Sequence, residues 1–268
     1  MKKFLFFVAL TPTQLLTPLR KNLFLQFLNA LENQTYQNWQ AILIGEEEKN
    51  DGRIIYKKTY LKTKSEKLIS AYKYFLTLRE KPDYIIRLDD DDLISPNVLQ
   101  KVVTCSVDFD CYADKYHAYY DVVSGQVCHV QNAWMPNTII HKTNHAISSY
   151  THDAKPLVLL DHSKYWMEYY LGKRIIWENK TTPVYLRIMS PTSITSGMSS
   201  QSIMNFSTDI LNNYHRKTKG IGKWKNEQPE EFANYINVLK NDWKKISGLS
   251  HVQFKHSFIE TLLKKFVL

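Results

Sequence analysis

Apolar runs alternate with helical patterns along the first hundred residues, and this alternation restricts the possible folds more than any other feature of the sequence. Predominantly apolar runs at residues 4–10, 39–44 and 84–88 (FLFFVAL, WQAILI and YIIRL) predict strands, and the first, which is apolar throughout, is typical of a strand covered on both faces. Segments with helical periodicity separate them. The order strand, helix, strand, helix, strand predicts a mostly parallel sheet with right-handed crossovers. We therefore expect an α/β fold in which helices flank the sheet.

The two helices have recognisable start signals. Thr17 is a suitable N-cap, and Pro18 suits the first helical position. Apolar residues follow at a spacing of four: Leu19, Leu23, Phe27 and Leu31. Ser65 can cap the second helix, which residues 81–83 (KPD) end. Its apolar side carries Leu68, Tyr72, Phe75 and Leu76.

The rest of the chain divides into an irregular middle and a helical end. Residues 109–114, 115–123 and 126–131 predict short strands, which we expect to be antiparallel. After about residue 200 the pattern becomes helical, amphipathic and basic. We expect one α/β domain over residues 1–200 and a helical C-terminal extension over residues 201–268.

Composition narrows the function classes. The chain has only 8 glycines and neither GxGxxG nor GxxxxGK[ST], which argues against a glycine-rich phosphate loop. Its three cysteines lack metal-ligand spacing and favour a reducing compartment. The net charge of +9 is spread along the chain without a nucleic-acid motif, so we expect no nucleic-acid partner. A membrane surface or a phosphate-bearing substrate suits this charge equally well.

The N-terminal apolar run is too short for a secretory signal, and no small-residue cleavage site follows it. We interpret it as a buried first strand. No other run approaches the roughly 18 apolar residues of a membrane span. We therefore expect a cytoplasmic protein. We expect its basic C-terminal segment, residues 254–268, to pack on the main domain, to rest on the inner face of the membrane through residues 258–268, or to do both.

Four consecutive aspartates, Asp89–Asp92, follow the third apolar run. One interpretation is a solvated acidic turn. Their position at the carboxyl end of a strand, where ligands bind in parallel sheets, favours a divalent cation instead. Mg²⁺ and Mn²⁺ prefer carboxylates together with phosphate oxygens, and a strand would put Asp89 and Asp91 on the same side. The sequence predicts a metal site formed by Asp89, Asp91 and Asp92.

Two motifs together resemble the inverting nucleotide-sugar glycosyltransferases of the GT-A fold. Residues 31–40 (LENQTYQNWQ) are similar to that family's Q-T-Y-x-[ND]-[WF]-E segment, and residues 87–92 (RLDDDD) are similar to its L-D-x-D-D metal motif. The R-L-D-x-D-D form is closest to a bacterial branch assigned as rhamnosyltransferases. The resemblance covers about residues 4–195. It implies a GT-A, Rossmann-like catalytic domain within residues 1–200.

The resemblance also implies a reaction and its participants. A Mn²⁺- or Mg²⁺-dependent enzyme would move a sugar from a nucleotide-diphosphate donor to a glycan or lipid-linked acceptor in bacterial surface polysaccharide synthesis. The leaving diphosphate needs a cation, and the acceptor hydroxyl needs a base. Asp161 is the implied base, with His162 as the alternative; Asp161 could instead be a helix-start acid. The donor nucleotide would contact Thr11, Glu46, Asp89, Asp90 and Arg187, and Arg187 could instead be solvated on an edge strand.

The chain departs from the family in the nucleotide site. Residues 11–14 (TPTQ) stand where the family has P-x-Y-N, residues 46–48 (EEE) where it has Asp-Asp, and residues 64–67 (KSEK) where it has A-R-N. The donor sugar, the base, the acceptor and the oligomeric state are therefore not specified. Two alternatives remain open: a catalytically silent GT-A scaffold or glycan-binding protein, and a Mg²⁺-dependent nucleotidyl or phosphoryl transferase.

Two other groups attract functional interpretations. Asp108 and Asp110 form a second D-x-D, but it leads into a strand, so we interpret it as structural. His141, His145 and His152 lack the HExxH pattern or cysteine partners of a zinc site, and we expect them to line an acceptor groove or to lie in loops. Asp153 is a distant alternative to Asp161 as the base.

Overall fold

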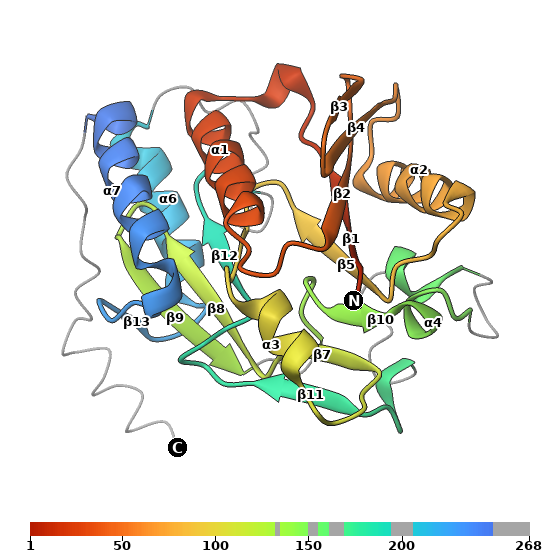
Figure 1. Cartoon of the computed structure of the whole chain (residues 1–268). Helices are drawn as coiled ribbons and strands as arrows, with labels where there is room; N and C mark the ends of the chain where they lie inside the picture. Colours follow the sequence, from red (N-terminus) through yellow and green to blue (C-terminus); the bar gives the residue numbers. More distant parts are fainter. Residues whose placement is uncertain (132–134, 150–154, 161–168, 194–205, 249–268) are drawn as a thin grey trace.

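The computed structural model describes residues 1–131, 135–149, 155–160, 169–193 and 206–248, which form two sheets and the helices around them (Figure 1). The eight-stranded sheet has the order β11-β7-β10-β5-β1-β2-β4-β3. Its strands are β1 (Phe4–Ala9), β2 (Trp39–Gly45), β3 (Lys49–Asp51), β4 (Ile54–Lys58), β5 (Tyr84–Asp89), β7 (Cys111–Asp114), β10 (Ile140–Lys142) and β11 (Ile175–Glu178). The five-stranded sheet has the order β13-β9-β8-β12-β6. Its strands are β6 (Leu93–Ile94), β8 (Tyr116–Asp121), β9 (Gln126–Gln131), β12 (Tyr185–Met189) and β13 (Trp224–Lys225).

The helices lie outside the sheets (Figure 1). They are α1 (Pro18–Glu32), α2 (Lys64–Thr77), α3 (Val98–Thr104), α4 (Thr143–Ala146), α6 (Thr208–Lys219) and α7 (Ala233–Ser247). None of the helices in the described part of the chain is both long and apolar enough to cross a membrane.

The parallel centre of the large sheet is built from the three apolar runs. Strand β1 pairs in parallel with β2 on one side and β5 on the other, and β2 pairs in parallel with β4. Successive side chains of β1 point to opposite faces: Phe4 and Phe6 pack in the cluster that contains residues of α1, whereas Leu5 and Phe7 pack with residues of α2. Both faces are covered, so the run is apolar throughout. The predicted α/β fold, with helices flanking the sheet, is confirmed.

The helix starts are confirmed in one case and corrected in the other. The Oγ1 of Thr17 accepts a hydrogen bond from Arg20 N (3.2 Å), and Pro18 is the first residue of α1. The predicted cap of α2, Ser65, is wrong. Thr63 caps this helix, because Glu66 completes a capping box by accepting from Thr63 N (3.1 Å) while its own N–H donates to Thr63 Oγ1 (3.3 Å).

The four aspartates lie where the chain passes from one sheet to the other. Strand β5 ends at Asp89, and a turn follows in which Asp92 N donates to Asp89 O (3.2 Å). Strand β6 begins at Leu93 and pairs with β12 of the second sheet, with Leu93 opposite Leu186. The expectation that strand geometry aligns Asp89 with Asp91 is therefore wrong, since a turn sets their directions.

The helical end shares the main hydrophobic core. Tyr214, Phe232, Ile236 and Trp243 are buried in the cluster that contains residues of α1 and both sheets. Tyr214 Oη also donates to Asp121 Oδ1 of β8 (2.5 Å). Helix α7 packs against α1. The predicted division at residue 200 stays a prediction, and the segment 254–268 lies outside the described residues.

This packing predicts how the protein unfolds. Trp243 is 0% exposed, whereas Val238 on the same helix is 41% exposed. We expect Trp243→Ala to lower the free energy of unfolding by about 3–5 kcal/mol, because it leaves a large cavity. Val238→Ala, as the control, should cost about 1 kcal/mol or less. Urea unfolding followed by fluorescence and circular dichroism should show one shared transition; two separate transitions would mean that the helical end is an independent domain.

Candidate functional site

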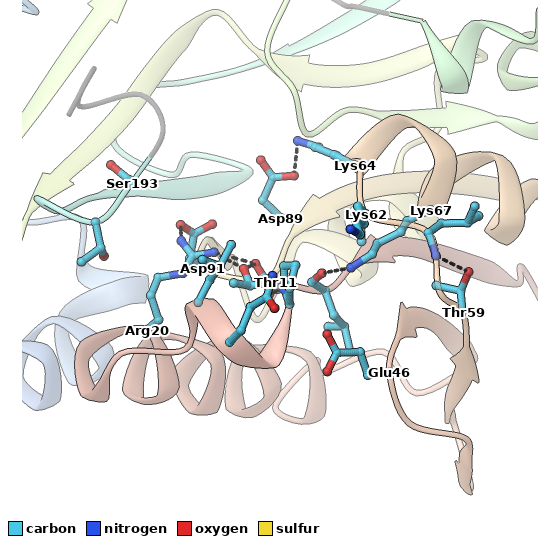
Figure 2. Close-up of a pocket in the computed structure, with 18 of the residues that line it drawn as sticks. Thr11, Arg20, Glu46, Thr59, Lys62, Lys64, Lys67, Asp89, Asp91 and Ser193 are labelled. Atoms are coloured by element: carbon cyan, nitrogen blue, oxygen red, sulfur yellow. Dashed lines mark hydrogen bonds and ion pairs between the residues drawn. The ribbon is translucent and has the colours of Figure 1, made fainter. Parts of the chain in front are cut away.

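A pocket of about 910 Å³ opens at the carboxyl ends of β1, β4 and β5 (Figure 2). Four elements surround it. The turn Asp89–Asp92, Arg20 near the start of α1 and several of residues 58–67, which lead into α2, all line it. Strand β12 contributes Arg187. The pocket therefore lies where ligands bind in α/β sheets, and it is lined by charges of both signs.

Three of the four aspartates converge in this pocket. Asp89, Asp91 and Asp92 each offer a carboxylate oxygen, and these oxygens all lie within 4.8 Å of one another. Burial, together with the charge of Asp91, raises the pKa of Asp92 well above its ordinary value. Crowded oxygen ligands whose mutual repulsion a cation would relieve are what Mg²⁺ or Mn²⁺ requires, so this donor set fits such an ion.

Protein cations pair with two of these carboxylates. Lys64 Nζ lies 2.5 Å from Asp89 Oδ1, and Arg20 Nη1 pairs with Asp91 Oδ2. Burial alone would raise the pKa of Asp89, but Lys64, Arg187 and Arg87 outweigh it and hold that pKa well below its ordinary value. Figure 2 shows Lys64 reaching Asp89 from the α2 side, while Arg20 reaches Asp91 from α1.

Asp90 shares Arg20 with Asp91 and ties the turn to the end of β1. Its Oδ2 accepts from Thr11 N (2.6 Å), and its Oδ1 accepts from Thr11 Oγ1 (3.1 Å) and Arg20 Nη2 (3.1 Å). Burial raises its pKa to about 6 despite these donors. Both carboxylate oxygens of Asp90 are thus engaged within the protein, and so is Thr11. Their predicted contacts with a nucleotide remain predictions.

Arg20 was missed by the sequence reasoning, although a signal existed. A cation in the first turn of a helix is unfavourable beside the positive end of the helix dipole, so its presence there indicates an acidic partner. Burial lowers the pKa of Arg20, but Asp91 and Asp90 outweigh burial and raise it. Arg20 therefore stays charged while it joins α1 to the acidic turn.

The remaining predicted residues lie on two sides of the pocket. Glu46 is exposed, and its Oε1 accepts from Thr13 N (3.2 Å). Arg187 is half-buried on β12, which lies between β8 and β6, so the solvated edge-strand alternative is wrong. Burial lowers the pKa of Arg187, but Asp92, with a smaller contribution from Asp89, outweighs it and raises that pKa. Arg187 therefore belongs electrostatically to the acidic cluster.

A row of lysines on the α2 side was also missed. Lys58, Lys62, Lys64 and Lys67 all line the pocket. Lys67 is buried, and its Nζ donates to Leu10 O at the end of β1 (2.7 Å). Burial lowers the pKa of Lys67. In the sequence, the three-residue spacing of Lys64 and Lys67 indicates a common helix face. That this face lies along the pocket depends on how α2 packs, which the sequence does not show.

The residues predicted as the acceptor base lie outside the described part of the chain. Asp161 and its alternative His162 lie outside the described residues, as do His152 and Asp153. Their assignment as acceptor base therefore remains a prediction.

The other two histidines are core residues. His141 lies on β10 and His145 in α4; both are buried, with their Nδ1 atoms 3.5 Å apart. The expectation of an acceptor groove or a loop is wrong for this pair, since the fold turns them inward against Tyr170, whose Oη lies 3.5 Å from His141 Nε2.

Asp108 and Asp110 serve structure, as predicted. Asp108 Oδ2 accepts from Arg174 Nη2 (2.5 Å), and Asp108 also pairs with Lys142. Asp110 Oδ2 accepts from Arg174 N (2.9 Å). These carboxylates therefore link the ends of β7, β10 and β11.

Comparisons with known proteins find structural similarity at low sequence identity. No family model matches the chain, and no curated protein matches it. Among solved structures it is similar to TarS residues 1–349 of S. aureus, with 10% identity and a TM-score of 0.47 over 91% of this chain and 81% of that one. It is also similar to a protein named as a nucleotide-diphospho-sugar transferase from Desulfovibrio desulfuricans (10% identity, TM-score 0.37, 82% and 99% covered). A third is the glycosyltransferase GlyE of Streptococcus pneumoniae (11% identity, TM-score 0.38, 85% and 66% covered).

The position of Arg20 generates a stability prediction. Arg20→Met leaves Asp90 and Asp91 close together without their shared cation. We expect a loss of about 2–4 kcal/mol in the free energy of unfolding, between the values for exposed and buried pairs. The exposed neighbour Lys21 provides the control, since Lys21→Met should change stability by about 0.5 kcal/mol or less. Equal losses in the two variants, measured by urea unfolding at pH 7.5, would contradict the joining role of Arg20.

The buried histidines generate a pH prediction. Burial, His145 and Arg87 together lower the pKa of His141 well below its ordinary value. In the unfolded chain this histidine takes up a proton near pH 6.5, whereas the folded protein does not, so stability is lost as the pH falls below that point. We expect the wild type to lose about 1.4 kcal/mol more than His141→Leu between pH 7.5 and 5.5. Urea unfolding at the two pH values measures this, and equal losses would show that His141 titrates normally when folded.

Proposed function

We propose that the protein is a glycosyltransferase that uses a nucleotide-diphosphate sugar, binds Mn²⁺ or Mg²⁺ and inverts the anomeric configuration. The observation that carries the proposal is the set of three carboxylates, Asp89, Asp91 and Asp92, at the base of the pocket formed by the ends of the parallel strands. The two sequence motifs that resemble GT-A glycosyltransferases support it, because one of them contains these aspartates. The rhamnosyltransferase branch is the nearest resemblance and leaves the donor sugar open.

The pocket offers what a sugar nucleotide requires. A diphosphate carries negative charge that needs cations, and Lys62, Lys64 and Arg187 all line the pocket near the acidic turn. Asp89, Asp91 and Asp92 would hold the metal ion, and the ion would supply Lewis-acid stabilisation of the leaving diphosphate. Arg20 holds one carboxylate of this set in place through its ion pair with Asp91. Such outer contacts orient metal ligands and tune their basicity.

The reaction is a displacement at the anomeric carbon. The acceptor oxygen forms a bond to that carbon, while the bond between the carbon and the diphosphate oxygen breaks. The acceptor proton passes to a base, for which we propose the carboxylate of Asp161, with His162 as the alternative. The nucleoside diphosphate leaves with the electron pair, and Lys64 and Arg187 are placed in the pocket to stabilise its charge.

The acceptor and the setting follow from the same resemblance. We propose a glycan or lipid-linked hydroxyl as acceptor, in bacterial surface polysaccharide synthesis at the cytoplasmic side of the membrane. The basic segment 254–268 would provide any contact with the membrane surface.

One observation favours a second candidate, a catalytically silent protein of the same fold. Arg20 and Lys64 already neutralise Asp91 and Asp89, so the acidic turn has protein cations of its own. A silent scaffold or glycan-binding protein would retain this arrangement without binding a donor. A nucleotidyl or phosphoryl transferase is less well supported, because the residues after β1 (TPTQ) offer no phosphate-binding turn.

Calorimetric titration separates these candidates. UDP, GDP and dTDP are titrated into the protein with and without Mn²⁺, and again into Asp91→Ala. We expect one nucleotide to bind in a metal-dependent way and Asp91→Ala to weaken that binding at least tenfold, because a metal ligand is lost. Asp108→Ala removes a carboxylate of the structural D-x-D and should bind like the wild type. If none of the three nucleotides binds under any condition, the glycosyltransferase proposal fails and the silent-scaffold candidate takes its place.

A further inference from the structure

Lys64 differs from Arg20, the other cation paired with a metal-site carboxylate, because its side chain is more exposed and has fewer partners. Its side chain is 45% exposed, whereas that of Arg20 is 13% exposed. Arg20 also contacts Thr11 and Asp90 besides Asp91, so its guanidinium is held in place. In the described part of the chain, the Lys64 ammonium forms one ion pair, with Asp89. One cation is thus a fixed part of the turn, and the other sits at the pocket's edge.

The backbone beneath Lys64 is rigid. Lys64 is the first residue of α2, directly after the Thr63 cap, whose hydroxyl and N–H are both engaged with Glu66. The four-carbon side chain can therefore swing about a fixed anchor. Figure 2 shows it extending from α2 to Asp89. A different direction of the same side chain would bring the ammonium over the pocket interior.

Asp89 is the carboxylate that Lys64 and a divalent cation would share. Its oxygen belongs to the set within 4.8 Å that includes Asp91 and Asp92. A divalent ion among these oxygens would attract Asp89 more strongly than a single ammonium does and would repel that ammonium. The pocket space next to Lys64 is also where the diphosphate of a donor would lie if the proposed function holds, since Lys62 and Arg187 line it as well.

We propose that Lys64 is an exchange residue, which changes its ion-pair partner. It pairs with Asp89 in the metal-free protein, and its ammonium moves to the donor's diphosphate when a divalent cation binds Asp89. This inference rests on the proposed function and adds a coupling to it. Metal and lysine compete for one carboxylate, and metal and nucleotide cooperate because the displaced lysine becomes a ligand for the phosphates.

The test separates metal binding from nucleotide binding. Mn²⁺ binding to the nucleotide-free protein is followed by electron paramagnetic resonance of the free ion, and binding of UDP, GDP and dTDP at saturating Mn²⁺ by calorimetry. We expect Lys64→Met to bind Mn²⁺ about three- to tenfold more tightly than the wild type, because the competing ammonium is gone. We expect the same variant to bind its nucleotide about tenfold or more weakly, the loss of one charge-assisted hydrogen bond.

Two control variants sharpen the result. Lys73→Met removes a positive charge from the exposed face of the same helix, outside the pocket, and should leave both affinities unchanged. Lys64→Arg keeps the charge and should retain most of the nucleotide affinity. If Lys64 had only a structural role, Lys64→Met would not shift the Mn²⁺ affinity and the nucleotide affinity in opposite directions.

The outcomes distinguish this inference from the proposed function. If the wild type binds Mn²⁺ and a nucleotide through Asp91, but Lys64→Met leaves either affinity unchanged or weakens both, the exchange role is overturned and the proposed function stands. If the wild type binds none of the three nucleotides, the proposed function fails and the exchange role fails with it.

Discussion

The turn Asp89–Asp92 crowds four carboxylates into the junction of two sheets, and cations from three different elements make that arrangement stable. Arg20 comes from α1, Lys64 from α2 and Arg187 from β12. Without them, desolvation and mutual repulsion would drive protons onto the carboxylates or force the turn open. This charge balance therefore joins α1, α2 and β12 to the turn.

Each carboxylate of the turn has a different environment. Asp90 is engaged by Thr11 and fixes the end of β1, and Asp92 accepts from Ile188 N (2.9 Å) and fixes β12. Asp89 and Asp91 are less buried, and each pairs with one cation at the pocket. A run of identical residues thus divides into groups that hold the fold and groups that face a ligand, with Asp92 contributing to both.

The helical end supports the site from a distance. Helix α7 packs on α1, and Asn33 Nδ2, just after α1, donates to Tyr235 Oη (3.2 Å). Ser95, which directly follows β6, donates a hydrogen bond to Glu231, two residues before α7 begins. Because α1 carries Arg20 and Ser95 closely follows the acidic turn, these contacts link the helical end to the turn by two routes.

The central strands, the start of α1 and the position of the acidic turn could be predicted from the sequence, because each depends on local properties: apolar runs, a capping threonine before a proline, and residues adjacent in the chain. The cap of α2 is also a local property, because Thr63 and Glu66 stand at the spacing of a capping box, which outweighs Ser65 as a start signal. Which cations pair with the turn depends on the tertiary structure. Arg20 and Lys64 are 71 and 25 residues away from the carboxylates they pair with, and periodicity cannot report partners that helix packing brings together. The same holds for His141, which the pairing of β10 with β5 buries although polar residues follow it in the chain.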